Sequence, residues 1–326
     1  MNELLKINNL DVQFDTDEGR ITAVENVSLS VKQGEVLGIV GESGSGKSVT
    51  AKAIMQLNPG NTIYNEDAEV IIDGENVIKF TSKEDLKKIR GGKVSMIFQE
   101  PMASFAPAIK IGDQMVEQLL LHKNIKKEEA KSISLDMLTR VGITDTEKRF
   151  NQYAFELSGG MRQRAMIAMA LSTMPKLLLA DEPTTALDVT IQAQVLKLMK
   201  DIIKEYKMGV IFITHDLGVI AQTADQIAVM YLGCVVEKGS VNEILKNPKH
   251  PYTKGLIAAL PDVNNLEAPL KPIPGNIPSP LERPTNCVFR TRCPNPTHEC
   301  KEGKTPMGLV EISPGHWVDK CCVNCG

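Results

Sequence analysis

Long apolar runs are missing from this chain of 326 residues. No uncharged stretch approaches the eighteen or so apolar residues that a membrane-spanning helix needs. The longest candidate, AMIAMALSTMPKLLLA, is interrupted by Pro175 and Lys176. The N-terminal segment MNELLKINNLDVQF lacks the apolar core of a secretory signal. We therefore expect a cytoplasmic protein that associates with a membrane only through a partner.

A strong net charge is also absent, since the formal charge is -3 at pH 7. This balance gives no overall attraction for nucleic acid, although composition does not reveal a local basic patch. The hydrophobic content of 42% is ordinary for a soluble globular protein. The length predicts either one large domain with an appendage or two domains.

Cysteine is scarce until the C-terminus, where six of the seven cysteines occupy the last forty positions. Disulfides are disfavoured in the cytoplasm, so such a cluster favours metal or redox chemistry. Five residues separate Cys287 from Cys293, six separate Cys293 from Cys300, and Cys321 follows after twenty more. This spacing fits zinc ribbons poorly and iron–sulfur clusters better. Zinc or free thiols remain the alternative, with His298 either a zinc ligand or an ordinary surface histidine.

Alternating and β-branched segments predict strands, and apolar spacing near 3.6 predicts helices. The expected strands are 4–14, 21–31, 35–40, 68–78, 176–181 and 209–216, with a hairpin at 226–240. The expected helices are 48–57, 112–122, 126–142 and 190–206, within a helical pattern from about 113 to 172. Strand–helix alternation around a helical insert favours a mainly parallel α/β core. After about Pro261, seven prolines in 25 residues predict an extended linker, and the chain contains no internal repeat.

A glycine-rich segment, GESGSGKS at 41–48, matches the phosphate-loop pattern between a buried strand and a helix. Its backbone amides would surround phosphate oxygens, Lys47 would neutralise the β- and γ-phosphates, and Ser48 would ligate Mg²⁺. The strand KLLLAD ends at Asp181, a second Mg²⁺ ligand. The adjacent Glu182 is the candidate general base for an attacking water.

The segment ELSGGMRQRAMIAMAL, at 156–171, predicts a helix capped by Ser158 with two glycines at its start. With the phosphate loop and KLLLADEP, this segment makes residues 4–240 resemble an ABC ATPase. The resemblance implies that Gln99 forms a Q-loop, which senses Mg²⁺ and the attacking water. It implies that ALD (186–188) is a D-loop, with Asp188 at the interface of a dimer. It also implies that His215 is a switch histidine, which contacts the γ-phosphate.

The resemblance also implies a set of ATP contacts. On the same subunit they are Gly41, Glu42, Ser43, Gly44, Ser45, Gly46, Lys47, Ser48, Val49, Gln99 and Asp181, with Mg²⁺ held through Ser48, Gln99 and Asp181. The partner subunit would supply Ser158, Gly159, Gly160 and Asp188. For adenine stacking the candidates are Phe14, which is equally consistent with a core position, and Arg20 in the segment DTDEGR.

Several stretches resemble the ATPases of bacterial dipeptide, oligopeptide and nickel importers. They are FQEPMASFAPAIKIGDQMVEQL, HPYTKGLIAALP, IPGNIPSP and CVFRTRCP. The segment SFAPAIK departs from the usual SLNP, which leaves contacts with the membrane partner open. Peptide import is the expected function, with nickel import or a soluble ABC ATPase acting on nucleic acid or ribosomes as alternatives. In these relatives a similar tail holds a [4Fe–4S] cluster, which implies ligation by Cys287, Cys293, Cys300 and Cys321, with Cys322 as the alternative fourth ligand and Cys325 spare.

The expected fold class is α/β: an ABC-type P-loop NTPase core with a mainly parallel sheet, an antiparallel β subdomain and a helical subdomain. The core would cover residues 1–260 with the helical subdomain at about 100–170, and residues 261–326 would form the linker and cysteine tail. The expected partners are two transmembrane permease subunits, a second homologous but non-identical ATPase and, indirectly, an extracytoplasmic substrate-binding protein, with no nucleic acid. The protein would sit at the cytoplasmic face of the membrane and use ATP, Mg²⁺ and a [4Fe–4S] cluster, or zinc in its place.

Overall fold

The computed structural model describes residues 3–185, 187–260, 272–305 and 307–323. The chain forms two compact units, each assembled from segments that are far apart in the sequence. Unit 1 comprises Met1–Leu5, Val31–Glu35 and Ile72–Ile213, and unit 2 comprises Lys6–Ser30, Val36–Ile71 and Thr214–Gly326. The first part of the predicted linker, 261–271, lies outside the described residues, so the predicted domain boundary stays a prediction.

Parallel strands form the centre of unit 1. They are β7 (Val94–Ile97), β8 (Leu177–Asp181) and β9 (Gly209–Ile213), in the order β9–β8–β7. Every residue in these strands is buried. Burial on both faces explains why KLLLAD and GVIFI are continuous apolar runs rather than alternating ones.

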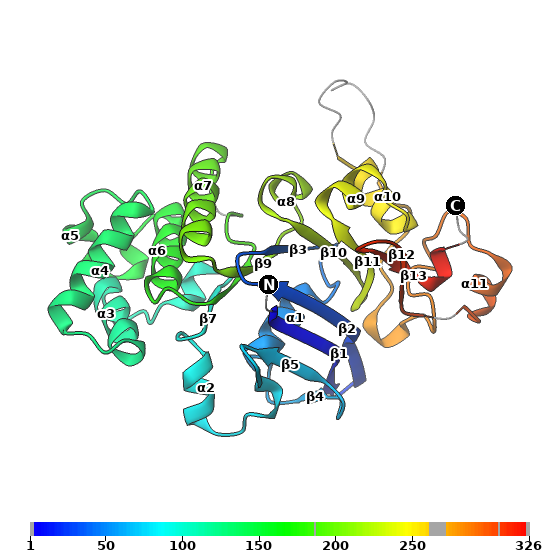
Figure 1. Ribbon diagram of the computed structural model, residues 1–326, viewed down its shortest axis with the longest axis horizontal. Coiled ribbons are helices and arrows are strands. Elements are labelled where there is room, and N and C mark those ends of the chain that lie inside the picture. The colour runs from blue at the N-terminus through cyan, green and yellow to red at the C-terminus, as the bar shows by residue number, and fades with distance from the viewer. Residues whose placement is uncertain (1–2, 186, 261–271, 306, 324–326) are drawn as a thin grey trace. The chain divides into compact units, whose positions relative to one another are not determined.

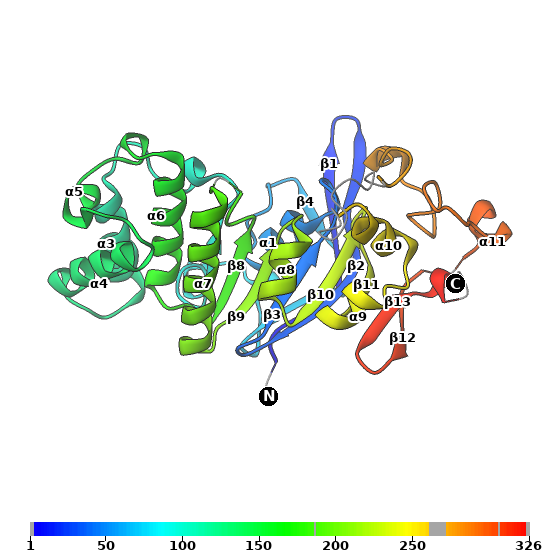
Figure 2. The same ribbon diagram turned by 90° about the horizontal axis from the view of Figure 1, so that it is seen from above.

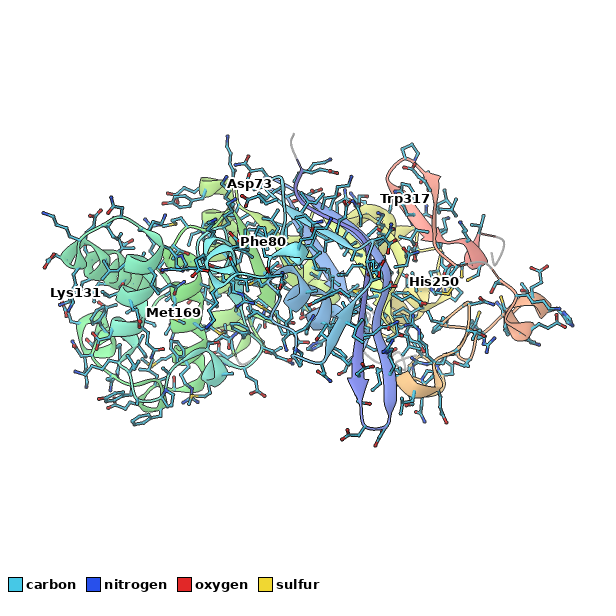
Figure 3. The ribbon with its side chains drawn as sticks, turned by 90° about the horizontal axis from the view of Figure 1, so that it is seen from below. Asp73, Phe80, Lys131, Met169, His250 and Trp317 are labelled. Atoms are coloured by element: carbon cyan, nitrogen blue, oxygen red, sulfur yellow. The ribbon has the colours of Figure 1, made fainter. Side chains whose placement is uncertain are left out.

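The helices of unit 1 include the predicted helical insert. They are α2 (Lys83–Ile89), α3 (Ile111–His122), α4 (Lys127–Arg140), α5 (Thr146–Phe150), α6 (Gly159–Ser172) and α7 (Val189–Tyr206), with a short strand β6 (Glu75–Asn76) and 3₁₀ turns η1 (Val77–Lys79), η2 (Pro101–Ser104) and η3 (Ala154–Glu156). Helices α3 to α6 pack on one another as a bundle (Figure 1). Lys131 on α4 and Met169 on α6 mark this bundle in Figure 3. The predicted fold class therefore includes its helices, and the bounds of about 100–170 for a helical subdomain stay a prediction.

Antiparallel strands from the first hundred residues lie mainly in unit 2. They are β1 (Glu3–Thr16), β2 (Gly19–Lys32), β4 (Thr62–Tyr64) and β5 (Glu69–Ile72). Their order is β2–β1–β5, and β4 also pairs with β1. The segment DTDEGR forms the tip of the β1–β2 hairpin. The expected Asp73-Gly74 turn follows β5, and both residues have positive φ.

Unit 2 also contains strands β3 (Val36–Val40), β10 (Gln226–Tyr231), β11 (Cys234–Ser240), β12 (Leu309–Ser313) and β13 (His316–Asp319). Their order is β12–β13–β11–β10–β3. Strands β3 and β10 are parallel, whereas β10–β11, β11–β13 and β13–β12 are antiparallel (Figure 2). The β10–β11 hairpin was predicted, but the β12–β13 hairpin in the tail was not.

Short helices complete unit 2. They are α1 (Lys47–Ile54), α8 (Leu217–Thr223), α9 (Val241–Lys246), α10 (Pro251–Ala258) and α11 (His298–Glu302), with 3₁₀ turns η4 (Pro280–Glu282) and η5 (Lys320–Cys322). Helix α10 begins with Pro251, which suits a first helical position. The His250 side chain caps this helix by accepting a hydrogen bond from the Tyr252 backbone.

Polar side chains attach the C-terminal hairpin to the rest of unit 2. The buried His316 ring lies between two carboxylates, 2.8 Å from Glu237 Oε1 and 3.1 Å from Glu243 Oε2. Glu237 is also fully buried and accepts hydrogen bonds from the backbone N–H groups of Lys249 and His250. Nearby, the Lys238 ammonium lies 5.0 Å from the centre of the Trp317 ring. Because buried carboxylates require several partners, this network fixes β13 against β11.

Candidate functional site

The phosphate loop connects β3 to α1 within unit 2, as predicted. Two of its glycines are required by the geometry. Gly46 has φ of +98°, and a Cβ there would lie 2.7 Å from the Ala23 carbonyl oxygen. A Cβ on Gly41 would collide with the carbonyl oxygen of Met230. Only glycine permits this tight path, which leads directly into the N-terminus of α1.

Lys47 lies inside the loop rather than in solvent. Its Nζ donates to the carbonyl oxygens of Gly41 at 2.8 Å and Glu42 at 2.9 Å, and to Ser45 Oγ at 3.3 Å. The lysine side chain is buried, while Ser48 and Val49 are partly exposed and Ser43 and Gly44 are exposed. The loop therefore presents a positive charge and a helix N-terminus from one short segment.

Asp181, Glu182 and Gln99 lie in unit 1. Asp181 ends β8 and is buried, and Gln99 follows β7, the neighbouring strand. Gln99 Nε2 donates to Glu182 Oε2 at 3.4 Å, which brings the Q-loop amide to the candidate base. Glu182 has φ of +48°, a costly conformation for a residue with a side chain. Its N–H donates to the Ile213 carbonyl oxygen, and this bond helps to hold that conformation.

The signature segment begins α6, also in unit 1. Ser158 is the N-cap, and its Oγ accepts a hydrogen bond from the Met161 N–H, as predicted. Ser158 is exposed and Gly159 and Gly160 are partly exposed, so the start of α6 is accessible. Gln163 was not predicted to matter, yet it is fully buried and donates to the Pro183 carbonyl oxygen. This bond ties the signature helix to the turn that follows Glu182.

Asp188 and His215 lie at the starts of helices. Asp188 caps α7 by accepting from the Ile191 N–H, and the adjacent Val189 is 83% exposed. Ala186, the first residue of the predicted D-loop, lies outside the described residues. His215, in unit 2, follows β9 and is exposed, just before the Asp216 cap of α8. A dimer contact for Asp188 and a phosphate contact for His215 both require partners outside this chain.

The two candidates for the adenine contact lie on the β1–β2 hairpin. Phe14 is partly exposed and pairs with Thr62 of β4. Arg20 is exposed and forms an ion pair with Asp15 at 2.8 Å, which raises the pKa of the guanidinium. Adenine stacking by either residue stays a prediction.

The tail brings several thiols together in unit 2. Cys321 Sγ lies 3.4 Å from Cys287 Sγ and 3.4 Å from Cys322 Sγ. Burial raises the pKa of Cys293, a hydrogen bond with the Asn295 backbone opposes this shift, and Cys287 and Cys300 add to it. Cys300 Sγ accepts a hydrogen bond from Thr297 Oγ1 at 3.1 Å. Cys321 thus lies beside Cys287 and Cys322, whereas within the described residues neither Cys293 nor Cys300 belongs to a group of three ligand atoms within 4.8 Å of one another, and Cys325 lies outside the described residues.

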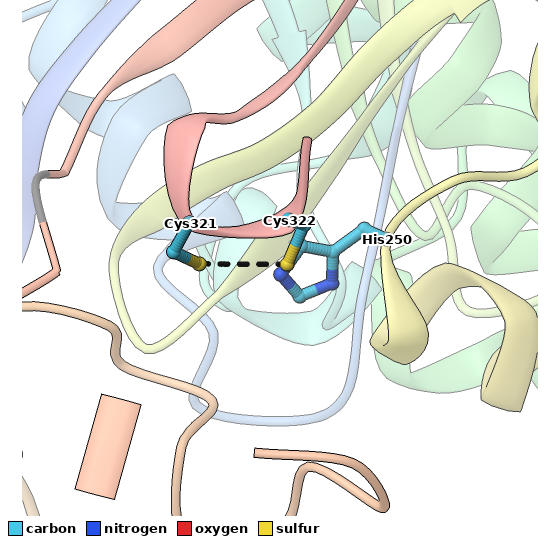
Figure 4. A group of neighbouring side chains, drawn as sticks. All are labelled: His250, Cys321 and Cys322. Carbon is cyan, nitrogen blue, oxygen red and sulfur yellow. Dashed lines mark hydrogen bonds between the residues drawn. The ribbon is translucent and has the colours of Figure 1, made fainter. Parts of the chain in front are cut away.

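His250 is a residue near these thiols that sequence reasoning missed. Its ring and the sulfurs of Cys321 and Cys322 lie close enough that one ligand atom from each falls within 4.8 Å of the others (Figure 4). Burial, and secondarily Lys254, lowers the pKa of His250 to about 3, so the ring is neutral. Because Nδ1 accepts from the Tyr252 N–H, the proton is on Nε2. Nε2 can therefore donate to a thiolate but cannot bind a metal without a change of tautomer.

The other candidate zinc ligand, His298, is on the surface. Its side chain is 84% exposed at the start of α11, and Nε2 lies 3.5 Å from Glu302 Oε1. The ordinary interpretation of this histidine is the one that the structure supports.

Comparison with known families accounts for most of the chain. The ABC transporter family matches residues 24–185, which include the phosphate loop, the signature segment and Asp181-Glu182. The family described as oligopeptide/dipeptide transporter, C-terminal region, matches residues 236–300. The chain belongs to the ABC transporter ATPases.

Individual relatives of this ABC ATPase cover nearly its whole length. It is 47% identical to the oligopeptide transport ATP-binding protein OppD of Bacillus subtilis, over 97% of this chain and 87% of that protein. It is 45% identical to the dipeptide transport ATP-binding protein DppD of the same organism, over 100% of this chain and 95% of that protein. The family is that of ATP-hydrolysing subunits, so the predicted enzyme class is confirmed.

Solved structures confirm the predicted fold class. The dimeric ATP-binding cassette MJ0796, in a post-hydrolysis state bound to ADP and Pi, aligns with a TM-score of 0.66 at 29% identity, over 73% of this chain and 98% of that one. CbiO1 from Clostridium perfringens aligns with a TM-score of 0.63 at 25% identity, over 76% of this chain and 92% of that one. Within the described ranges, none of the ABC ATPase's helices combines the length and the apolar composition needed to cross a membrane.

Proposed function

We propose that this ABC ATPase powers the import of dipeptides or oligopeptides through a membrane transporter. The observation that carries the proposal is the match of residues 236–300 to the oligopeptide/dipeptide transporter C-terminal region. OppD and DppD, relatives of nearly full length, bear oligopeptide and dipeptide transport names. Nickel import and a soluble role on nucleic acid or ribosomes are the competing outcomes of the test below.

The proposed ATP chemistry assigns one role to each motif. Lys47 and the loop amides of residues 41–49 bind the phosphates, and the oxygen atoms of Ser48, Gln99 and Asp181 suit Mg²⁺, which prefers hard oxygen ligands. That ion would neutralise phosphate charge. Glu182 accepts a proton from the attacking water. The Gln99 amide, 3.4 Å from the Glu182 carboxylate, orients that carboxylate and the water. His215 contacts the γ-phosphate.

A second ATPase subunit, homologous but not identical, would complete each site by offering Ser158, Gly159, Gly160 and Asp188 to the nucleotide. The support is the accessible start of α6 and two exposed apolar residues, one three positions before Ser158 and one at the start of α7. Phe155 is 61% exposed and Val189 is 83% exposed. Large apolar side chains in such positions suit a protein interface. ATP would then favour the closed dimer and hydrolysis the open one.

Two transmembrane permease subunits would bind the helical subdomain, which would place the protein at the cytoplasmic face of the membrane. Exposed apolar residues also occur there: Met102, Ile109, Leu120 and Leu121 are each at least 41% exposed. An extracytoplasmic substrate-binding protein would act on the permeases rather than on this chain. The division into an ATPase domain at 1–260 and a tail at 261–326 is part of this proposal.

Reconstitution with the permeases and the second ATPase tests the proposal. Vesicles should take up labelled peptide in an ATP-dependent manner, and Glu182→Gln in this chain should retain ATP binding while turnover falls by at least about a hundredfold, as expected when a catalytic base is removed. Uptake of nickel but not of peptide would overturn the proposal that peptides are the transported substrate. Stable nucleic-acid binding without any membrane subunit would overturn the transport role. Unchanged turnover would refute Glu182 as the base.

We also propose that the tail binds a metal centre through thiolates. The resemblance to peptide importers favours a [4Fe–4S] cluster on Cys287, Cys293, Cys300 and Cys321, and the soft sulfur ligands of neighbouring Cys287 and Cys321 suit such a group. Zinc is the second candidate. The 3.4 Å separations of Cys321 Sγ from Cys287 Sγ and from Cys322 Sγ are near the roughly 3.8 Å edge of a zinc tetrahedron with 2.3 Å bonds.

Metal analysis separates the two candidates. Protein purified without oxygen should contain about four irons and four acid-labile sulfides per chain, and Cys287→Ser and Cys321→Ser should each lower both. One zinc without sulfide would replace the cluster by a zinc site, whereas neither metal would leave free thiols. Comparing Cys321→Ser with Cys322→Ser identifies the fourth ligand, because only loss of the true ligand lowers the metal content.

A further inference from the structure

The second residue of the phosphate loop, Glu42, is held by the C-terminal region of unit 2. Its carboxylate receives a two-pronged ion pair from Arg292, with Nη1 2.7 Å from Oε2 and Nη2 3.1 Å from Oε1. Arg292 lies in the cysteine-rich segment CVFRTRCP, immediately before Cys293. A residue 250 positions away in sequence therefore contacts the loop expected to bind ATP.

The Arg292 guanidinium is built into this position. Its side chain is only 3% exposed. The Nε atom donates to the Pro274 carbonyl oxygen at 3.0 Å, Nη2 also donates to the Ile273 carbonyl oxygen at 3.3 Å, and the group lies 5.8 Å from the centre of the Tyr231 ring. A buried guanidinium is costly unless its donors are used, and here all three nitrogens have partners.

The backbone of Glu42 is held from the same region. Its N–H donates to the Tyr252 hydroxyl at 2.8 Å. Tyr252, on α10, is fully buried and packs against Tyr231 and Phe289, with ring centres 4.7 Å and 5.4 Å away. Phe289 lies in the same tail segment as Arg292, so side chain and main chain of Glu42 are both anchored to aromatic and charged groups outside the loop.

The charge of Glu42 gives this contact a consequence. A carboxylate beside a triphosphate site repels the ligand, because two negative charges in a partly buried site are screened less than in bulk water. Arg292 neutralises that carboxylate. Its side chain also fixes where Glu42 points, while Tyr252 fixes the loop amide next to Gly41.

We infer that Arg292 and Tyr252 are positioning residues for nucleotide binding, through which the C-terminal region sets the affinity of the phosphate loop for ATP. The inference rests on the proposed role of that loop in ATP binding. Neither residue is expected to touch the nucleotide; both act through Glu42.

Equilibrium binding of Mg²⁺ with AMP-PNP, a non-hydrolysable ATP analogue, to the full chain tests this. Arg292→Gln should weaken binding roughly tenfold, within the usual range for coupling between sites. Glu42→Gln serves as the reference for the double variant of Glu42→Gln and Arg292→Gln, which should bind like Glu42→Gln alone, because no unpaired carboxylate remains. Arg292→Lys, which retains the charge, should be intermediate. Tyr252→Phe should weaken binding about threefold by leaving the Glu42 N–H unpaired.

Matched controls separate this effect from general damage. Arg290→Gln alters the same residue type in the same segment, where the guanidinium lies against Gly303, and should leave binding unchanged. In steady-state turnover, Arg292→Gln should raise the KM for ATP while kcat changes less than twofold. Thermal unfolding establishes that each variant is folded. If Arg292→Gln does not fold, comparing Glu42→Gln with Tyr252→Phe still measures how the contacts that hold Glu42 affect AMP-PNP binding.

Different results would overturn the inference and the proposed ATP site. If the wild type binds AMP-PNP, Lys47→Ala does not, and folded Arg292→Gln and Tyr252→Phe bind normally, the inference is wrong and the proposed ATP site stands. If Lys47→Ala binds as well as wild type, the proposed site is wrong. A double variant weaker than either single variant would also overturn the charge-neutralising role of Arg292.

Discussion

The phosphate loop and the cysteine tail are held in place by different means. The loop is short and local: glycines give it its path, and Lys47 donates to three atoms within six residues of itself. The tail has few regular elements and is fixed by long-range polar contacts, such as His316 with Glu237 and Arg283 with Glu25. The phosphate loop is held by its backbone conformation, whereas the tail is held by pairing between side chains.

This difference explains which region a sequence reveals. A backbone that must adopt positive φ needs glycine at fixed spacing, and such spacing is visible as a motif. A salt bridge between residues hundreds of positions apart leaves no spacing to recognise. The tail therefore resembles an unstructured linker in sequence, although its described residues include the strands β12 and β13 and the helix α11, and most of β13 is buried.

The largest expected effect is on stability, from the loss of the His316 side chain that attaches the C-terminal hairpin. His316→Leu removes an imidazole that faces two carboxylates and leaves the fully buried Glu237 with fewer partners. We expect the free energy of unfolding to fall by about 3 kcal/mol, as when one partner of a buried ion pair is lost. Denaturant titration followed by fluorescence of Trp317, the neighbouring residue, measures it.

The control for this prediction is His298→Leu. That side chain is 84% exposed, so its loss should change the free energy of unfolding by no more than about 0.5 kcal/mol. Equal losses in the two variants would mean that side-chain pairing does not hold the tail.

The loop offers a comparison between two of its own glycines. Gly44 and Gly46 both have positive φ, but a Cβ on Gly44 would meet no atom within 4 Å, whereas one on Gly46 would lie 2.7 Å from the Ala23 carbonyl oxygen. Gly44→Ala should cost about 1 kcal/mol of stability from strain alone. Gly46→Ala should cost about 2 to 3 kcal/mol, since overpacking adds to the strain. Denaturant unfolding of both variants measures the difference, and similar costs would show that close packing does not fix the loop.

The smallest effect concerns Cys234, the one cysteine outside the tail. It is buried on β11, and burial raises its pKa to about 12, while Arg283 beside it opposes this shift. Only about one molecule in ten thousand is then a thiolate at pH 8, so alkylation by iodoacetamide should be slow and should rise about tenfold per pH unit between pH 7 and 9. Mass spectrometry of metal-free protein should detect modification of Cys293 first. A rate that levels off near pH 8.5 would mean that β11 opens readily.

Most of the fold was predictable because its elements carry their own signals. The buried runs KLLLAD and GVIFI, the turn Asp73-Gly74 and the periodic helix at 190–206 each occur where the pattern placed them. The hairpin β12–β13 was missed, although GLVEISPGHWVD alternates around a Pro-Gly turn. Its short strands lie in a segment dominated by proline and cysteine, and pairing with β11 decides its structure.

The candidate site divides in the same way. Motifs identified the loop, the cap at Ser158, and Gln99 and Glu182 as candidate site residues, whereas the contact between Gln99 and Glu182 was found only in the structure. Gln163, His250 and Arg292 were not identified, because a buried polar residue is recognisable only when its partner is known. Of the three, Arg292 pairs with a residue inside the motif itself.

The position of β13 has a further consequence for solubility. Strand β11 pairs with β10 on one side and with β13 on the other, so the tail covers what would otherwise be the open edge of a sheet. The new outer strand, β12, is five residues long and has Glu311 at its centre. Short, charged edges resist pairing with other chains, whereas a bare CVVEKGS edge invites it. The C-terminal hairpin thus protects the protein against aggregation, and truncations made before residue 309 will expose that edge.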